Sequence, residues 1–320
     1  MKIEIITTPN EKLKETGFGL LKACENVLEI LQQSYDVKLN VCKDKNDLDN
    51  IIDRKPDLIV LAVKYIVSDR GKNIWLADFF ENKNVNFTGS INSVLHFDSN
   101  KESAKAFLKN KGIKTADYFT ITSQYSYNHE DELPIKFPLF LKPLGSANGN
   151  GIDEESLVRD FNSFKNKVKS IFDTFDQITL VEKYLEGREF TVAIIEDRKK
   201  QNLFIAPIEI IPPLMNNGSR ILGEKVKQEN SEKLKSIIDT KTKSKVETLA
   251  TEVFKLLNIR DFGRIDIKMD GEGECYFMEV NLVPGMTKGS SYFPRAFEIA
   301  QKIDYDSVVK MIIESSINRK

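Results

Sequence analysis

The sequence predicts an α/β protein that begins with a small domain built on a parallel sheet. Residues 1–98 alternate short apolar strand patterns with helical patterns, as expected when successive strands are joined by crossover helices. One strand pattern, residues 57–63, is almost wholly apolar, which is typical of a strand covered on both faces. The chain has 320 residues, enough for two or three domains with their own cores.

The elements of the first domain follow from apolar periodicity. Period-2 or fully apolar runs predict strands, and apolar residues at helical spacing predict helices. We expect strands at residues 2–7, 36–42, 57–63 and 85–88, and helices at 19–33 and 74–82.

A new helix is expected to begin at residue 99. Ser99 and Glu102 have the spacing of a capping box, in which two side chains satisfy backbone amides at a helix start. The helix places Lys101 in its first turn and Lys105 one turn later.

The loop 144–151 directly follows a predicted strand, residues 137–142, that ends at Pro143. Its glycines and asparagines allow successive backbone N–H groups to point inward at an anion, so the loop is a candidate phosphate cover. A flexible hairpin loop is an equal alternative, because Gly-Asn-Gly is also ordinary turn chemistry.

The segment 212–232 is polar, shows little periodicity and contains Lys225. Such a long irregular stretch in a compact domain is usually functional or disordered. Around it we expect strands at 178–185, 189–195 and 204–211, a helix opened by a second capping box at 244–247, and a final helix at 305–318.

Residues 263–281 read as a β-hairpin that brings oxygen ligands and cations to one face. The two arms alternate, and the residues between them tolerate the positive φ of a hairpin turn. The expected pairs are Met269 with Glu274, Asp266 with Phe277, and Arg264 with Glu279. The residues expected on one face are Arg264, Asp266, Lys268, Glu279 and Asn281.

Carboxylate and amide oxygens on a strand face favour a Mg²⁺ site. Asp, Asn and Glu are depleted in strands, and clustered like charges are costly unless a cation or water compensates. Mg²⁺ is typically held by one or two carboxylates together with substrate phosphates. Taken alone, the hairpin is also consistent with a solvated outer face that carries ordinary exposed carboxylates.

Charge and composition argue against other classes of function. Lys and Arg number 47 and Asp and Glu 48, a formal net charge of −1, so no global field attracts nucleic acid or an anionic membrane. No apolar run approaches the roughly 20 residues that span a bilayer, and no signal-peptide core is visible. Cys24, Cys42 and Cys275 lie far apart, which favours reduced thiols. We expect a cytoplasmic protein that binds neither nucleic acid nor membrane.

The order of these candidates along the chain resembles that of ATP-grasp enzymes. More narrowly, residues 182–192, 263–266 and 279–287 are similar to the D-alanine–D-alanine ligase family, and the resemblance runs from about Ser93 to Arg295. It implies an α/β (α+β) ATP-grasp fold of two subdomains after the N-terminal domain. The implied domains are 1–98, Rossmann-like; 99–184, with the phosphate loop; and 185–320, with the metal-binding hairpin.

The resemblance implies an ATP site. Lys101 and Lys142 would neutralise the phosphates beneath the Gly-rich loop, Glu182 would meet the adenine edge, and Glu189 would accept from the ribose hydroxyls. Without the resemblance, these lysines read as solvated surface residues and these glutamates as exposed strand-end charges. The implied nucleotide-binding residues are Lys101, Lys142, Asn148, Gly149, Glu182, Lys183, Leu185 and Glu189.

The resemblance also implies a metal site and an oxyanion site. Asp266, Glu279 and Asn281 would hold Mg²⁺, or Mn²⁺ in its place, between the β- and γ-phosphates. Arg264 would stabilise charge on the transferring phosphoryl group and on the tetrahedral intermediate, and the Gly285 amide would donate to the oxyanion.

Two further roles concern the lid and the second substrate. Lys225 would sit on a lid and touch the γ-phosphate, although it reads equally as one lysine on a solvated loop. Ser290 and Ser291 would hold the carboxylate of the second substrate. A plain turn into a helix with Ser caps is an equal alternative for this stretch.

The implied reaction joins two small amino-acid substrates in two stages. A carboxylate attacks the γ-phosphate to form an acyl phosphate, and an amine then displaces phosphate to form an amide. The resemblance further implies a homodimer.

The chain departs from the family pattern where amino acids bind. Residues 7–17 lack the glycines of the family's first loop, which leaves Glu11 or Glu15 to pair with an amine, although each also reads as a surface carboxylate. We take Glu15 as the candidate. Residues 63–71 and 223–227 also differ from the family, whereas the ATP and Mg²⁺ positions are intact.

The family pattern is thus kept at the ATP and Mg²⁺ positions and altered at the amino-acid positions. This combination favours a carboxylate–amine ligase that forms a dipeptide or a related amide. A ligase for amino acids other than D-alanine, in peptide-metabolite synthesis, is one alternative. A non-catalytic ATP-binding regulator is another, and a kinase that stops at phosphoryl transfer is a third.

Overall fold

A computed structural model describes residues 1–9, 11, 18–67, 71–122, 127–145, 149–215 and 218–319. The N-terminal region contains a parallel sheet with strand order β2–β1–β3, as predicted. All of β3 is buried, in agreement with its apolar sequence. The elements of this region are β1 (Lys2–Thr7), α1 (Leu21–Leu31), β2 (Asp36–Val41), α2 (Lys45–Asp53), β3 (Leu58–Leu61) and α3 (Leu76–Glu81).

The connection after β3 differs from the prediction. It contains an antiparallel hairpin of β4 (Tyr65–Val67) and β5 (Asn73–Trp75), so the helix expected from residue 74 begins at Leu76. The strand expected at 85–88 is reduced to an isolated parallel bridge between Phe87 and Ile59. Helix α2 was not predicted.

Two helices lead out of the N-terminal region, α4 (Asn92–Ser99) and α5 (Lys101–Asn110). The cap between them is Asn100, whose side chain accepts a hydrogen bond from the Ser103 amide at 3.0 Å. The capping box predicted at Ser99 is therefore wrong. Ser99 is the last residue of α4, so it does not precede the helix that it was expected to cap.

The central region is an antiparallel sheet with strand order β6–β9–β7–β8. Helix α6 packs on it through Phe164 and Ile171, which belong to a small separate core. The strands are β6 (Tyr118–Ile121), β7 (Leu139–Pro143), β8 (Leu157–Val158) and β9 (Thr179–Lys183), and α6 spans Phe161–Phe175. Short 3₁₀ turns lie at Glu130–Glu132 and Glu154–Ser156.

The C-terminal region is an antiparallel sheet with strand order β12–β11–β10–β13–β14. Helix α8 begins at Thr240 behind an Asp239 cap, four residues before the predicted Ser244, because the Asp239 carboxylate accepts from two backbone amides. The strands are β10 (Glu189–Asp197), β11 (Asn202–Ile211), β12 (Lys233–Ser236), β13 (Phe262–Met269) and β14 (Cys275–Asn281). The helices are α7 (Glu224–Glu229), α8 (Thr240–Leu256), α9 (Tyr292–Gln301) and α10 (Tyr305–Ile317).

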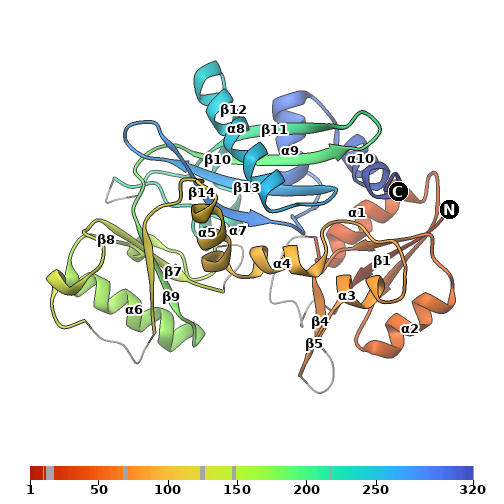
Figure 1. Ribbon diagram of the computed structural model, residues 1–320, viewed down its shortest axis with the longest axis horizontal. Helices are drawn as coiled ribbons and strands as arrows, with labels where there is room; N and C mark the ends of the chain where they lie inside the picture. The colour runs from red at the N-terminus through yellow and green to blue at the C-terminus, as the bar shows by residue number, and fades with distance from the viewer. Residues whose placement is uncertain are drawn as a thin grey trace.

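The N-terminal and C-terminal regions share apolar cores. Ile5 and Val60 of the first sheet belong to the same buried cluster as Phe262 of β13 and Phe293 of α9. Figure 1 shows the C-terminal sheet above, with the central sheet at the lower left and the N-terminal region at the lower right. Within the described part of the chain, no helix combines the length and apolarity needed to cross a membrane. The domain boundaries at residues 98 and 184 stay predictions.

Candidate active site

The β13–β14 hairpin carries its polar side chains on one face. Asp266 lies opposite Glu279, and Arg264 lies opposite Asn281. The expected register is wrong by two residues in this half of the hairpin and by one residue near the turn, where Met269 pairs with Cys275 and not with Glu274. A β-bulge gives β14 one extra residue, Met278, between the pairs Asp266–Glu279 and Ile267–Phe277. The predicted grouping on one face still follows, because residues directly opposite each other share a face.

Asp266 is held by donors from three strands. Arg264 on the same strand binds it in a bidentate way, Nε to Oδ1 and an η-nitrogen to Oδ2, both at 3.0 Å. Asn281 Nδ2 donates to Oδ2 at 3.1 Å, and Thr191 Oγ1 on β10 donates to Oδ1 at 2.6 Å. Burial lowers the pKa of Arg264, but the Asp266 carboxylate outweighs burial and raises it. Sequence reasoning missed Thr191, which is directly opposite Asp266 across the β10–β13 pair.

Glu279 lies among cations. Burial raises its pKa, but Lys101, Lys142, Lys227 and Arg264 outweigh burial and lower the pKa to about 2. Lys101 Nζ forms an ion pair with the Glu279 carboxylate at a distance of 3.7 Å. Glu279 is therefore ionised at neutral pH.

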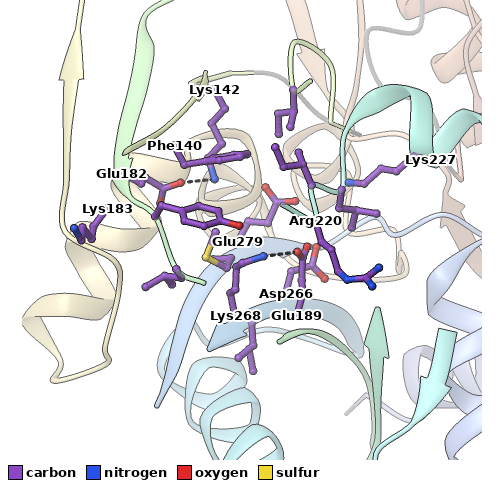
Figure 2. A pocket seen from close by; sticks show the side chains of 17 residues that line it. Phe140, Lys142, Glu182, Lys183, Glu189, Arg220, Lys227, Asp266, Lys268 and Glu279 are labelled. Carbon is purple, nitrogen blue, oxygen red and sulfur yellow. Dashed lines mark hydrogen bonds and ion pairs between the residues drawn. The ribbon is translucent and has the colours of Figure 1, made fainter. Parts of the chain in front are cut away.

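Glu182 is buried between two lysines. Its Oε1 lies 2.6 Å from Lys105 Nζ and its Oε2 lies 2.6 Å from Lys142 Nζ; Figure 2 shows the second pair. Burial raises the pKa of Glu182, but the two lysines outweigh burial and lower it to about 2. For Lys105, burial dominates and lowers the pKa, whereas for Lys142 the nearby carboxylates prevail and raise it. Sequence reasoning gave Lys105 no role. Its helical spacing from Lys101 was the available signal.

A cleft between the central and C-terminal sheets is lined by Lys142, Glu182, Asp266 and Glu279. It holds about 750 Å³ of space, a figure that includes open solvent. Apolar side chains such as Phe140 and Met278 provide walls for a flat ring, whereas Lys142 and Glu279 supply charge. The lining residues are Phe140, Lys142, Ile152, Glu182, Lys183, Tyr184, Leu185, Glu189, Arg220, Ile221, Leu222, Lys227, Asp266, Ile267, Lys268, Met278 and Glu279.

Two segments pack against each other at this cleft, the end of the Gly-rich loop and the start of α7. The Glu224 amide donates to the Ile152 carbonyl at 3.1 Å. A Cβ added at Gly223 would lie 2.5 Å from the same carbonyl oxygen, and one at Gly149 would lie 3.3 Å from the Glu224 nitrogen. Glycine permits this close approach. Asn148, predicted to contact phosphate, lies outside the described residues.

Helix α7 presents two lysines in different directions. Lys227 lines the cleft and contributes to the field at Glu279. The Lys225 side chain is 86% exposed and lies 4.0 Å from Glu229. The structure thus brings Lys227 to the predicted site and leaves Lys225 outside the clefts that hold the other predicted residues.

A second cleft adjoins the first. Lys227 borders both, and the second is also lined by Arg264, Gly285, Ser290 and Ser291, which brings four predicted residues together. The remaining lining is Leu20, Asn150, Glu224, Gln228, Asn230, Thr287 and Tyr292.

Tyr292 and Ser291 shape the far wall of this second cleft. The Tyr292 hydroxyl donates to Glu232 at 2.5 Å, and its ring lies 5.6 Å from the Arg264 guanidinium. Ser291 Oγ accepts from the Thr287 amide at 2.9 Å rather than capping α9. Glu15, the candidate for the first substrate, lies outside the described residues.

Comparison with known proteins gives a consistent result. A family model described as D-ala D-ala ligase C-terminus matches residues 107–314. A D-alanine–D-alanine ligase of Aquifex aeolicus is 26% identical over 299 residues, which cover 93% of this chain and 94% of that protein. The solved D-alanine–D-alanine ligase of Bacillus anthracis has a TM-score of 0.77 at 21% identity, covering 99% of this chain and 97% of the other. Its complex with ATP has a TM-score of 0.76 at 23% identity, with the same coverage.

Proposed function

Because this chain belongs to the D-alanine–D-alanine ligase family and is an ATP-dependent ligase that forms C–N bonds, we propose that it joins two amino acids through an acyl phosphate. D-Alanine is the first candidate for both substrates, which would place the enzyme in cell-wall synthesis. The observation that supports this proposal best is the meeting of two clefts at Lys227, the second of them lined by Arg264. One cleft suits a nucleotide and the other suits an amine substrate with a carboxylate.

In the first cleft, the base lies between the apolar walls and the phosphates lie towards the cations. Lys101, Lys142 and Lys227 neutralise phosphate charge, and Glu189 accepts from the ribose hydroxyls. Glu182 retains free lone pairs after pairing with two lysines, so it can still accept from the adenine amino group. Leu185 lines the cleft next to the base and offers backbone groups.

The donor set at the hairpin fits Mg²⁺. Asn281 donates through Nδ2 to Asp266, which leaves its carbonyl oxygen for a cation, and Glu279 is ionised beside it. Among the described residues no group of three His, Cys, Asp or Glu side chains could hold a metal. Two carboxylates, an amide oxygen and substrate phosphates are nevertheless a usual Mg²⁺ environment. When bound, Mg²⁺ would neutralise the charge that develops on the transferring phosphoryl group.

The second cleft completes the amide-forming step. Arg264 and the Gly285 amide stabilise the oxyanion of the tetrahedral intermediate, and Ser290 or Ser291 binds the carboxylate of the incoming amine substrate. We assign the phosphate-contacting role on the lid to Lys227 in place of Lys225. Closure of α7 on the Gly-rich loop excludes water, which would otherwise hydrolyse the acyl phosphate.

Ligation of amino acids other than D-alanine is the second candidate. Residues 7–17 lack the family's glycines at the place where the first amino acid is expected to bind, and Leu20 is the one aliphatic side chain among the described residues that line the second cleft. We further propose a homodimer that works in the cytoplasm, where ATP is available.

The test is a direct assay. The protein is incubated with ATP, Mg²⁺ and an amino-acid panel that includes D-alanine, and ADP, phosphate and coupled product are measured by mass spectrometry. Amino-acid-dependent release of ADP together with a dipeptide supports the ligase. ADP formation with a stable phosphorylated product would favour a kinase, and nucleotide binding without turnover of any amino acid would favour a regulator.

A matched pair of variants tests the metal assignment. Glu279→Gln should abolish turnover while partly sparing nucleotide binding, because it removes an anionic Mg²⁺ ligand. Glu272→Gln is the control, since Glu272 is an exposed residue in the turn of the same hairpin. Full activity of Glu279→Gln would refute the assignment.

A further inference from the structure

Lys268 and Glu189 form an ion pair inside the proposed nucleotide cleft. They lie directly opposite each other on β13 and β10, and Lys268 Nζ is 2.9 Å from Glu189 Oε2. Figure 2 shows the pair at the edge of the cleft, below Glu182. Their side chains are 13% and 20% exposed, so the pair is largely screened from water.

The surroundings of Lys268 explain why this pair is fixed. Its ammonium lies about 6.0 Å from the Tyr184 ring, and Glu189 is its one ion-pair partner among the described residues. A half-buried cation loses much of its hydration, which favours the geometry in which the carboxylate is within hydrogen-bond distance. The pair therefore orients Oε2 of Glu189 towards Lys268 on β13 and leaves Oε1 without a hydrogen bond in the described structure.

The position of the pair relates it to the nucleotide. Both residues line the proposed nucleotide cleft and also a neighbouring cleft that continues past Arg220. A carboxylate that accepts hydrogen bonds from two adjacent ribose hydroxyls needs a fixed orientation, because each hydrogen bond weakens steeply with poor geometry. Lys268 supplies that orientation through its ion pair with Oε2.

We propose that Lys268 is a positioning residue for nucleotide sugar recognition, which acts by holding Glu189 oriented towards the ribose hydroxyls. The inference deepens the proposed function, since it rests on the ribose-binding role proposed for Glu189. Lys268 itself makes no contact with the substrate in this scheme. Its effect depends on the sugar hydroxyls and not on the phosphates.

The experiment measures equilibrium binding of ATP and of 2′,3′-dideoxy-ATP, in the presence of Mg²⁺, by calorimetry. For the parent protein, loss of both hydroxyls should weaken binding roughly tenfold or more, as expected for hydrogen bonds to a charged group. Lys268→Met should weaken ATP binding by a similar factor and leave dideoxy-ATP binding nearly unchanged. Lys268→Arg, which keeps the charge, should restore most of the preference for ATP.

One further variant makes the outcomes distinguishable. Glu189→Ala should abolish the preference for ATP over dideoxy-ATP; if the preference persists there, the ribose role of Glu189 is wrong and the inference falls with it. If Glu189→Ala loses the preference but Lys268→Met keeps it, the inference alone is overturned. Equal weakening of both nucleotides by Lys268→Met would indicate a general electrostatic effect and would also overturn it.

The control is Lys114→Met. Lys114 pairs with Glu274 at 2.7 Å near the turn of the same hairpin, does not line the cleft, and is 55% exposed. It should leave both affinities at the parent values. Thermal unfolding of every variant identifies any that fail to fold, in which case Lys268→Arg supplies the comparison.

Discussion

Lys105 and Glu182 form an ion pair with an N–O distance of 2.6 Å in which neither side chain is more than 2% exposed. The pair connects α5 to β9, and it shares Glu182 with Lys142. A carboxylate in this environment is stable as an anion only while its cationic partners remain. In the proposed nucleotide complex, Lys105 would keep Glu182 paired if Lys142 turned towards a phosphate.

Replacement of Lys105 by Met should destabilise the protein by about 3 kcal/mol, because removal of one partner leaves a buried charge poorly compensated. Urea unfolding measures this change. Lys109→Met on the same helix is the control, since Lys109 and Asp117 are 57% and 73% exposed. Its cost should stay below about 1 kcal/mol. Equal costs for the two variants would contradict the assignment.

Acid should destabilise the parent protein through Glu182. Burial alone would raise the pKa of this carboxyl, but Lys105 and Lys142 outweigh burial and hold it at about 2, against an ordinary 4.5. A folded-state pKa below the unfolded value gives stability that is complete above about pH 4.5 and is lost as the pH falls towards 2. The free energy of unfolding, measured at constant ionic strength between pH 6 and pH 3, should fall less steeply in Glu182→Gln. Identical slopes would show that Glu182 is not responsible.

Thr191→Val should impair metal use. The hydroxyl donates to the Asp266 carboxylate at 2.6 Å, and Val removes the donor at nearly constant volume. Loss of a hydrogen bond to a metal-ligating carboxylate typically weakens metal affinity by roughly tenfold or more. The Mg²⁺ concentration for half-maximal activity measures the effect, and Mn²⁺ binding followed by electron paramagnetic resonance gives a reading independent of turnover. Thr191→Ser keeps a hydroxyl and should lie close to the parent; if Ser and Val behave alike, the hydrogen bond does not matter.

The two lysines of α7 should differ in their effect on catalysis. Lys227→Met should lower kcat by roughly 10²- to 10³-fold, as expected when a group that stabilises transition-state charge is removed. Lys225→Met should change kcat little, because this side chain is exposed and points outside both clefts. Steady-state kinetics of the two variants decides between them. The reverse order would restore Lys225 to the lid role.

Gly223→Ala should weaken nucleotide binding. The added methyl group would meet the Ile152 carbonyl at 2.5 Å and push α7 away from the Gly-rich loop. We expect the KM for ATP to rise several-fold, together with faster loss of acyl phosphate to water, which is measured as ADP released per mole of dipeptide formed. Gly271→Ala is the control, because nothing lies within 4 Å of its added carbon. An unchanged ratio of ADP to product in Gly223→Ala would show that this contact does not close the site.

The sequence was sufficient to predict the polar face of the hairpin but not its register. Alternation of side chains survives from Arg264 to Asp266, so the face was predictable. The bulge at Met278 is not, because nothing in that arm, such as a glycine, marks an extra residue. The roles of Lys105 and Thr191 depend on partners far away in the chain, which local patterns do not reveal.

The proposed lid, helix α7, is a second place where local sequence patterns were not enough to predict which side chain faces the site. Lys225 and Lys227 are two residues apart on a short helix, so they point to different sides. Which side faces the cleft depends on how α7 is rotated, and burial of Val226 and the close approach at Gly223 set that rotation. Both are tertiary contacts. The resemblance in sequence order indicated this segment and Lys225, whereas our proposal assigns the role to Lys227 of the same helix.

The distribution of the cores has a mechanical consequence. The N-terminal sheet and the C-terminal sheet share two apolar clusters, whereas the central sheet keeps a small cluster of its own with α6. Tilting the central sheet would therefore expose less apolar surface than separating the other two sheets, so we expect the central sheet to be the part that moves when the cleft opens. A nucleotide bound in the proposed cleft would contact both the central and the C-terminal sheets and hold them together, and we expect the cleft to open when the products leave.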